Sequence, residues 1–119
     1  MLHDKVKIMS QEIQQLELEI EEAKKAVDLR DTLIRLEQNK DFDAIILVAY
    51  LREHAINLVH AKGDFALQKE DQQRQLVRDI DAIGALKTFL VSIKQQGNMA
   101  EQALHEAEDT RVELLKEDL

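Results

Sequence analysis

The feature that most constrains this chain is a stripe of apolar residues near its N-terminus, spaced at alternating steps of three and four. The stripe consists of Val6, Met9, Ile13, Leu16, Ile20, Ala23 and Val27. Steps of three and four return to one side of an α-helix, so only a helix that lies against another helix can bury such a stripe. The sequence therefore predicts a long helix over residues 3–38, and we take these seven residues as candidate interface residues.

The sequence leaves the partner of this stripe open. A helix packed within one chain and a coiled coil between chains fit it equally well, since the regular stretch covers only about three heptads. Beyond Val27, the next positions of the pattern, Arg30 and Glu37, are polar. A shift of register near residues 28–31 is therefore predicted.

The composition favours helices throughout. The chain contains no proline and three glycines, and 45% of its 119 residues are hydrophobic while only 3% are aromatic. Strands and tight turns have little support in such a sequence. We expect a single all-α domain over residues 1–119, with three to four helices, in which a long N-terminal coiled-coil-like helix packs on or projects from a helical hairpin core.

Two core helices are predicted after the first, over residues 43–61 and 71–96. The apolar face expected for the second of them is widened by Val77 and Phe89 and consists of Leu76, Ile80, Ile83, Leu86, Leu90 and Ile93. Asn39 and Asp41 are good residues for a helix start. Residues 44–51 are apolar on all sides, which predicts a helix surrounded by neighbours. Gly63 predicts a helix end in the left-handed conformation, and Phe65 is expected to fill the core from the following connection.

The other two glycines mark the remaining features of the helical pattern. Gly84 lies in the middle of the predicted helix 71–96, where glycine costs about 1 kcal/mol relative to alanine. A close approach of another helix at Gly84 and Ala85 would offset that cost. Gly97 predicts either a break before a separate acidic helix over residues 98–119 or a kink in one long helix. Leu104 and Leu115 in that last segment are further interface candidates.

The charge and hydropathy patterns argue against two classes of binding partner, nucleic acids and membranes. The net charge is -8, and residues 98–119 carry two basic and seven acidic side chains, so this segment contributes -5 of the total. No direct nucleic-acid binding is expected, because it needs a basic face. The densest apolar run is too short to span a bilayer, and the N-terminus lacks the pattern of a signal peptide. No membrane partner and no secretion by a signal peptide are expected.

No motif for catalysis or cofactor binding stands out. The chain has no cysteine, and its four histidines do not form the helical zinc motif. Asp79 and Asp81 begin like a calcium loop, but Ile83 stands where the third oxygen ligand belongs. We expect no enzymatic activity, no catalytic residue, no metal site and no cofactor.

Two stretches near the C-terminus carry a resemblance to known proteins. They are Arg78-Asp79-Ile80-Asp81-Ala82-Ile83-Gly84-Ala85-Leu86-Lys87-Thr88-Phe89-Leu90 and Gln95-Gln96-Gly97-Asn98-Met99-Ala100-Glu101-Gln102-Ala103-Leu104. Over residues 78–104 the chain resembles small all-helical proteins of tailed bacteriophages. The resemblance implies a virion or particle-assembly component at the head, portal or neck, located in the virion or the host cytoplasm.

The leading hypothesis is therefore a non-enzymatic helical interaction protein that forms a homo-oligomer and docks on other phage particle proteins. One alternative is a phage-encoded acidic inhibitor that binds a host nucleic-acid enzyme. Another is a scaffold or chaperone used transiently during assembly.

Overall fold

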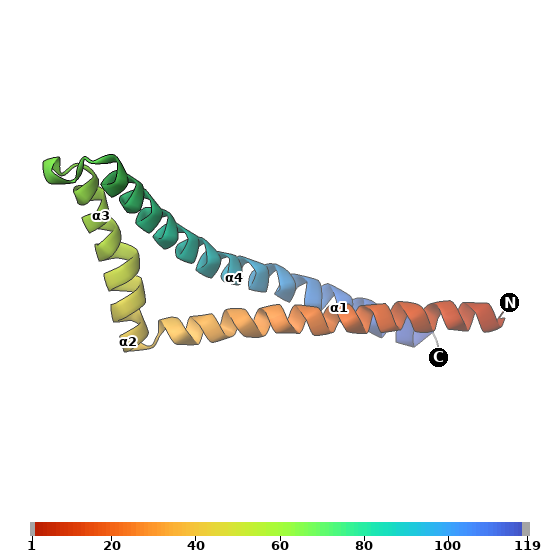
Figure 1. Cartoon of the computed structure of the whole chain (residues 1–119). Helices are drawn as coiled ribbons and strands as arrows, with labels where there is room; N and C mark the ends of the chain where they lie inside the picture. The colour runs from red at the N-terminus through yellow and green to blue at the C-terminus, as the bar shows by residue number, and fades with distance from the viewer. Residues whose placement is uncertain (1, 118–119) are drawn as a thin grey trace. The chain divides into compact units, whose positions relative to one another are not determined.

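The computed structural model describes the backbone of residues 2–117 and the side chains of this range except those of residues 2, 3 and 6. Within residues 2–117 the chain is helix and short turns, without any strand, so the all-α fold class is confirmed. The elements are α1 (Leu2–Glu37), α2 (Lys40–Phe42), η1 (Asp43–His54), α3 (Ala55–Lys62), η2 (Phe65–Leu67) and α4 (Glu70–Glu117). The two long helices in Figure 1 are α1 and α4.

The chain divides into two compact units. Unit 1 contains Met1–Asp31 and Ile93–Leu119, and unit 2 contains Thr32–Ser92. The sequence predicts one helical domain, whereas the structure groups the two ends of the chain together and the middle by itself. Each unit is described below on its own.

Unit 1 is an antiparallel pair of helices made from the first part of α1 and the last part of α4 (Figure 1). Arg30 of α1 bonds to Asn98 and Glu101 of α4. Leu16, two heptads earlier in α1, lines the same groove as Thr110 and Leu114, further along α4. Residues earlier in α1 therefore lie beside residues later in α4, as an antiparallel pair requires. Of the two open alternatives for the N-terminal stripe, packing within one chain is the arrangement observed.

Helix α4 is continuous through Gly97 and extends over 48 residues, or about 72 Å at 1.5 Å per residue. The segment 98–117 is therefore the end of α4 and not a separate helix. The buried and half-buried side of α4 repeats at alternating steps of four and three through Gly97 (Ile93, Gly97, Ala100, Leu104, Ala107, Arg111 and Leu114). Because Gly97 occupies a regular position of this stripe, the packed side of α4 continues through the glycine without a break.

Unit 2 begins with the predicted boundary after α1. The Asn39 side chain accepts hydrogen bonds from the backbone N–H groups of Asp41 and Phe42, at 2.9 and 3.1 Å. It thereby caps α2, because these first amides of a helix have no partner inside it.

The next element, η1, is a π-helix of 12 residues. Such helices are rare beyond a single turn and bond from residue i to i+5. None of the η1 residues is buried, and Ile45 is 64% exposed. The expectation that residues 44–51 are surrounded on all sides is therefore wrong for this chain alone. Because the apolar run is uninterrupted, its side chains point to every side of the helix, and part of them face solvent.

The core of unit 2 is thin. Among its hydrophobic residues only Leu33, Leu58 and Ile83 are buried, one each from α1, α3 and α4. The predicted face of the third helix is confirmed, since its other members in this unit are half-buried (Leu76, Ile80, Leu86 and Leu90). Val77 and Phe89, expected to widen that face, are exposed instead.

The turn between α3 and α4 ends α3 where Gly63 predicts it, but with another geometry. Gly63 has φ -88° and ψ -2°, in the right-handed region. The left-handed conformation expected there is therefore wrong. Side chains hold the turn instead: Gln68 Nε2 donates to the carbonyls of Lys62 and Asp64, and Gln73 Nε2 donates to those of Lys62 and Leu67.

Candidate interaction surfaces

The N-terminal stripe is covered along unit 1 by the same chain. Ile20 is only 3% exposed. Its neighbours in the stripe are half-buried (Met9, Ile13, Leu16, Ala23 and Val27), and the side chain of Val6 lies outside the described residues. On α4, Leu104 is half-buried in the opposing stripe, whereas Leu115 is exposed. Most of this candidate set therefore forms the core of unit 1 and is not a free surface.

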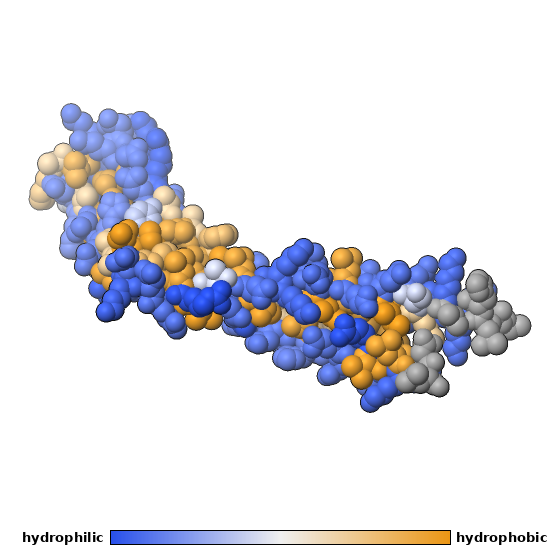
Figure 2. Space-filling view, turned by 90° about the horizontal axis from the view of Figure 1, so that it is seen from below, coloured by the Kyte–Doolittle hydropathy of each residue, from blue (hydrophilic) through white to orange (hydrophobic). Residues whose placement is uncertain are grey.

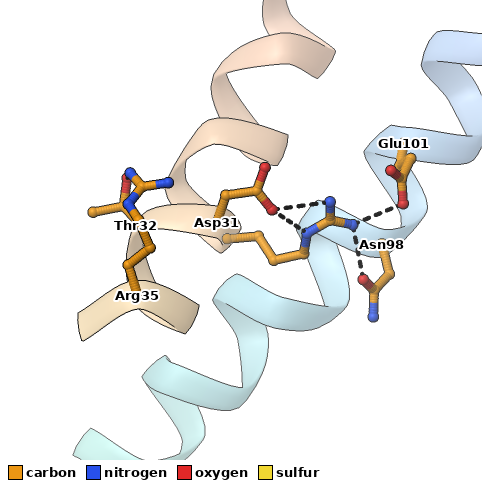
Figure 3. A network of polar contacts seen from close by, with 6 residues as sticks. Asp31, Thr32, Arg35, Asn98 and Glu101 are labelled. Carbon is orange, nitrogen blue, oxygen red and sulfur yellow. Dashed lines mark hydrogen bonds and ion pairs between the residues drawn. The ribbon is translucent and has the colours of Figure 1, made fainter. Parts of the chain in front are cut away.

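A polar cluster ends the apolar stripe of unit 1 (Figure 3). Arg30 Nη1 donates to Asn98 Oδ1 at 3.0 Å and to Glu101 Oε2 at 2.9 Å. Arg30 Nε and Nη2 both lie 3.1 Å from Asp31 Oδ1. The Arg30 side chain is 11% exposed, while the carboxylates of Asp31 and Glu101 are about half exposed. Each guanidinium nitrogen thus reaches an acceptor, which a buried charge requires.

Gly97 supplies the space that the Arg30 side chain occupies. A Cβ built on Gly97 would collide with Arg30 Cβ and lie 2.8 Å from Arg30 Cγ and Cδ. The aliphatic stem of Arg30 therefore lies directly across the α4 backbone. This contact and the two hydrogen bonds to α4 fix both the distance and the register of the helix pair.

The contacts within this cluster shift the pKa values of Glu101 and Arg30 in the directions that favour the ion pair. The hydrogen bond and charge of Arg30 hold the pKa of Glu101 below its ordinary value of 4.5. The hydrogen bond from Glu101 raises the pKa of Arg30, which desolvation partly opposes. Both charged forms are therefore favoured near neutral pH.

The sequence places the close helix contact at the wrong glycine. Gly84 is exposed, and a Cβ built on it would meet no heavy atom within 4 Å, so the predicted close packing at Gly84 is wrong in this chain. Ala85 beside it is also exposed. The spacing of the apolar residues could have indicated the close contact at Gly97, because Gly97 stands four residues after Ile93 and three before Ala100. Arg30 likewise stands three residues after Val27 and, although it is polar, continues the spacing of the stripe.

Unit 2 carries a large amount of exposed apolar surface. Its exposed hydrophobic residues occur on every helix of the unit except α2 (Ile34, Leu36, Ile45, Ile56, Val59, Val77, Phe89 and Val91, with Phe65 in the turn). Figure 2 shows hydrophobic side chains gathered on the surface around the end of α1 and α2. Soluble monomers rarely expose large contiguous apolar patches, so surface of this kind usually marks a contact with another protein.

Phe65 is the most exposed of these residues, at 98%. The prediction that it fills the core is therefore wrong. Its turn is held by the Asp64 side chain, which accepts from the Ala66 amide at 2.9 Å, and by Gln68, whose Nε2 lies 2.6 Å from the Asp64 carbonyl. These bonds hold the segment that carries the aromatic ring in a defined conformation.

An open groove of about 390 Å³ lies beside this turn. It is lined by Lys62 of α3 and by Glu70, Gln73, Arg74, Val77 and Arg78 of α4. Arg74 pairs with Glu70 at 3.0 Å, and within residues 2–117 neither Lys62 nor Arg78 has an ion-pair partner. The groove therefore combines the apolar Val77 and the aliphatic stems of long side chains with a basic rim.

Two further properties of the described residues bear on the kind of site. Within the part of the chain that the structure describes, no group of three or more His, Asp or Glu side chains is placed to hold a metal ion. No helix of residues 2–117 has an apolar stretch long enough to cross a membrane.

Comparisons with known proteins add no relative. No family model, no curated protein and no solved structure matches this chain.

Proposed function

We propose that this chain is a non-enzymatic helical interaction protein that associates with copies of itself and with components of a phage particle. One observation carries the proposal: unit 2 leaves exposed more hydrophobic side chains than it buries. Examples are Ile56 and Val59 on α3 and Val77 on α4. Such surface costs free energy in water and is stabilised when a partner covers it.

The resemblance over residues 78–104 supplies the phage part of the proposal, at the head, portal or neck. That segment belongs to α4 and includes Val91 and Met99, both exposed. In this proposal the antiparallel pair of unit 1 stabilises the chain, and unit 2 presents the contact surface. Docking on particle proteins then proceeds by burial of apolar side chains, while charges select the partner.

Two measurements test the proposal at different levels. Multi-angle light scattering across a range of protein concentrations should give a mass above 13.7 kDa, and a mass of one chain throughout would contradict self-association. Mass spectrometry of purified particles should find the protein with head, portal or neck components. Its presence only in assembly intermediates would favour the transient scaffold, and retention of a host polymerase or nuclease alone would favour the inhibitor.

A further inference from the structure

We infer that the α3–α4 turn of one copy docks in the groove beside the same turn of a second copy, so that two chains exchange Phe65 reciprocally. The inference rests on the proposed self-association and names the surface that performs it. The inserted segment, here called the knob, is Asp64 and Phe65. The receiving groove is lined by Lys62, Glu70, Gln73, Arg74, Val77 and Arg78.

The knob has the properties of an interface anchor. Phe65 is 98% exposed, and aromatic residues of this kind contribute a large share of binding energy when a pocket desolvates them. Gln68 and Gln73 bond the carbonyls on either side of the ring, those of Asp64 and Leu67. Because the turn is already ordered, little conformational entropy is lost when the ring is buried.

The groove matches the knob in size and in charge. Its volume of about 390 Å³ lies within the roughly 300–1,000 Å³ of pockets that accept organic ligands. Val77 offers apolar contact, and the guanidinium of Arg78 offers a cation to the face of an aromatic ring. Asp64 precedes Phe65 directly, so its carboxylate would enter beside the basic rim of Lys62 and Arg78. Opposite charges then meet where the ring is buried.

The occupant is a second copy because knob and groove lie at the same end of unit 2. Lys62 lines the groove and stands only three residues before Phe65. A two-fold axis near the turn therefore lets both contacts form at once, as in the isologous interfaces of most homodimers. Residues 32–92 carry eight basic and nine acidic side chains. Two copies of unit 2 thus meet with little net repulsion, although the whole chain carries -8.

A complementation experiment with the full-length chain tests this arrangement. Phe65→Ser removes the knob and leaves the groove, whereas the double variant Lys62→Glu and Arg78→Glu alters the groove and leaves the knob. Each variant alone should be monomeric by light scattering. The loss of one aromatic anchor raises the dimer Kd about 30-fold, and so about a thousand-fold for both contacts. A mixture of the two variants should form a mixed dimer, detected by native mass spectrometry, because one contact remains intact.

Phe89→Ser is the matched control, since Phe89 is also an exposed aromatic of unit 2, at 60%. It should leave the dimer mass unchanged. If the wild type self-associates but Phe65→Ser keeps its mass, the inferred contact is overturned while the proposed self-association stands. Equal losses in Phe65→Ser and Phe89→Ser, or no mixed dimer, would also overturn the contact. A wild-type monomer at every concentration would overturn both.

Discussion

The side chain of Arg30 crosses α4 at Gly97, so closely that a Cβ at position 97 would collide with the Cβ of Arg30. The same guanidinium then bonds to Asn98 and Glu101, one and four residues further along α4. A charged residue and a glycine, neither of which is an ordinary core residue, thus define the register of unit 1. Buried polar contacts are known to fix register in helix pairs in this way.

Gly97→Ala should destabilise the chain although alanine is the better helix former. Overpacking costs about 1–3 kcal/mol, against about 1 kcal/mol gained in helix propensity. Gly84→Ala is the matched control, since a Cβ there meets no atom within 4 Å. It should raise the free energy of unfolding by about 0.5–1 kcal/mol. Urea unfolding followed by circular dichroism compares the two, and a stabilised Gly97→Ala variant would contradict the close contact.

Stability should depend on pH through Glu101. Its pKa is lower in the folded chain than the ordinary 4.5 because Arg30 favours the carboxylate. The stabilisation is therefore fully present above about pH 4.5 and is lost as the pH falls through the lowered pKa. Glu101→Gln keeps the shape but cannot ionise. Its Tm should lie below that of the wild type at neutral pH and approach it in acid.

The control for this pH effect is Glu113→Gln, which removes the same charge from an exposed position of α4. Its difference in Tm from the wild type should be small at both pH values. If Glu113→Gln and Glu101→Gln gave parallel pH profiles, the net charge of the chain rather than the Arg30 contact would be responsible.

Ile20→Ala should be the most damaging single truncation in unit 1. Ile20 is 3% exposed, and truncation of a buried isoleucine to alanine costs about 2–5 kcal/mol. Leu18→Ala, two residues away on the exposed side of α1, should change stability by no more than about 0.5 kcal/mol. Thermal unfolding of both variants measures the contrast, and similar losses would show that the stripe is not the packed side.

Asn39→Ala should weaken the junction between α1 and α2. Its side chain caps two backbone amides of α2, and such caps contribute about 1 kcal/mol. Asn39→Asp keeps an acceptor oxygen in the same place and should retain most of the stability. Chemical unfolding compares the stabilities of the Asn39→Ala and Asn39→Asp variants. An equal loss of stability in both would assign the effect to the amide group rather than to capping.

Local sequence patterns are enough to predict the helices and most of their packed sides. The steps of three and four from Met9 to Val27 identify the buried side of α1, because helical geometry allows no other use of that spacing. Local rules of capping and periodicity likewise predict the boundary at Asn39, the end of α3 at Lys62 and the buried stripe through Ile83. The shift of register expected near residues 28–31 does not occur at Arg30, which is buried in step with the stripe, and the alternation of three and four changes only at the next step, to Leu33.

The partner against which each stripe packs follows from long-range contacts and not from local patterns. Nothing local in the N-terminal stripe specifies whether α4 or another chain covers it, because that choice depends on residues far along the chain, such as Thr110 and Leu114 beside Leu16. The same holds for the glycines: Gly84 and Gly97 both lie inside a helix, but only Gly97 faces a neighbouring side chain. Phe65 shows the converse, since its apolar character predicts burial while the bonds of Gln68 and Gln73 hold its turn outside the core. Burial is a property of the whole arrangement, whereas helix formation is a property of the local chain.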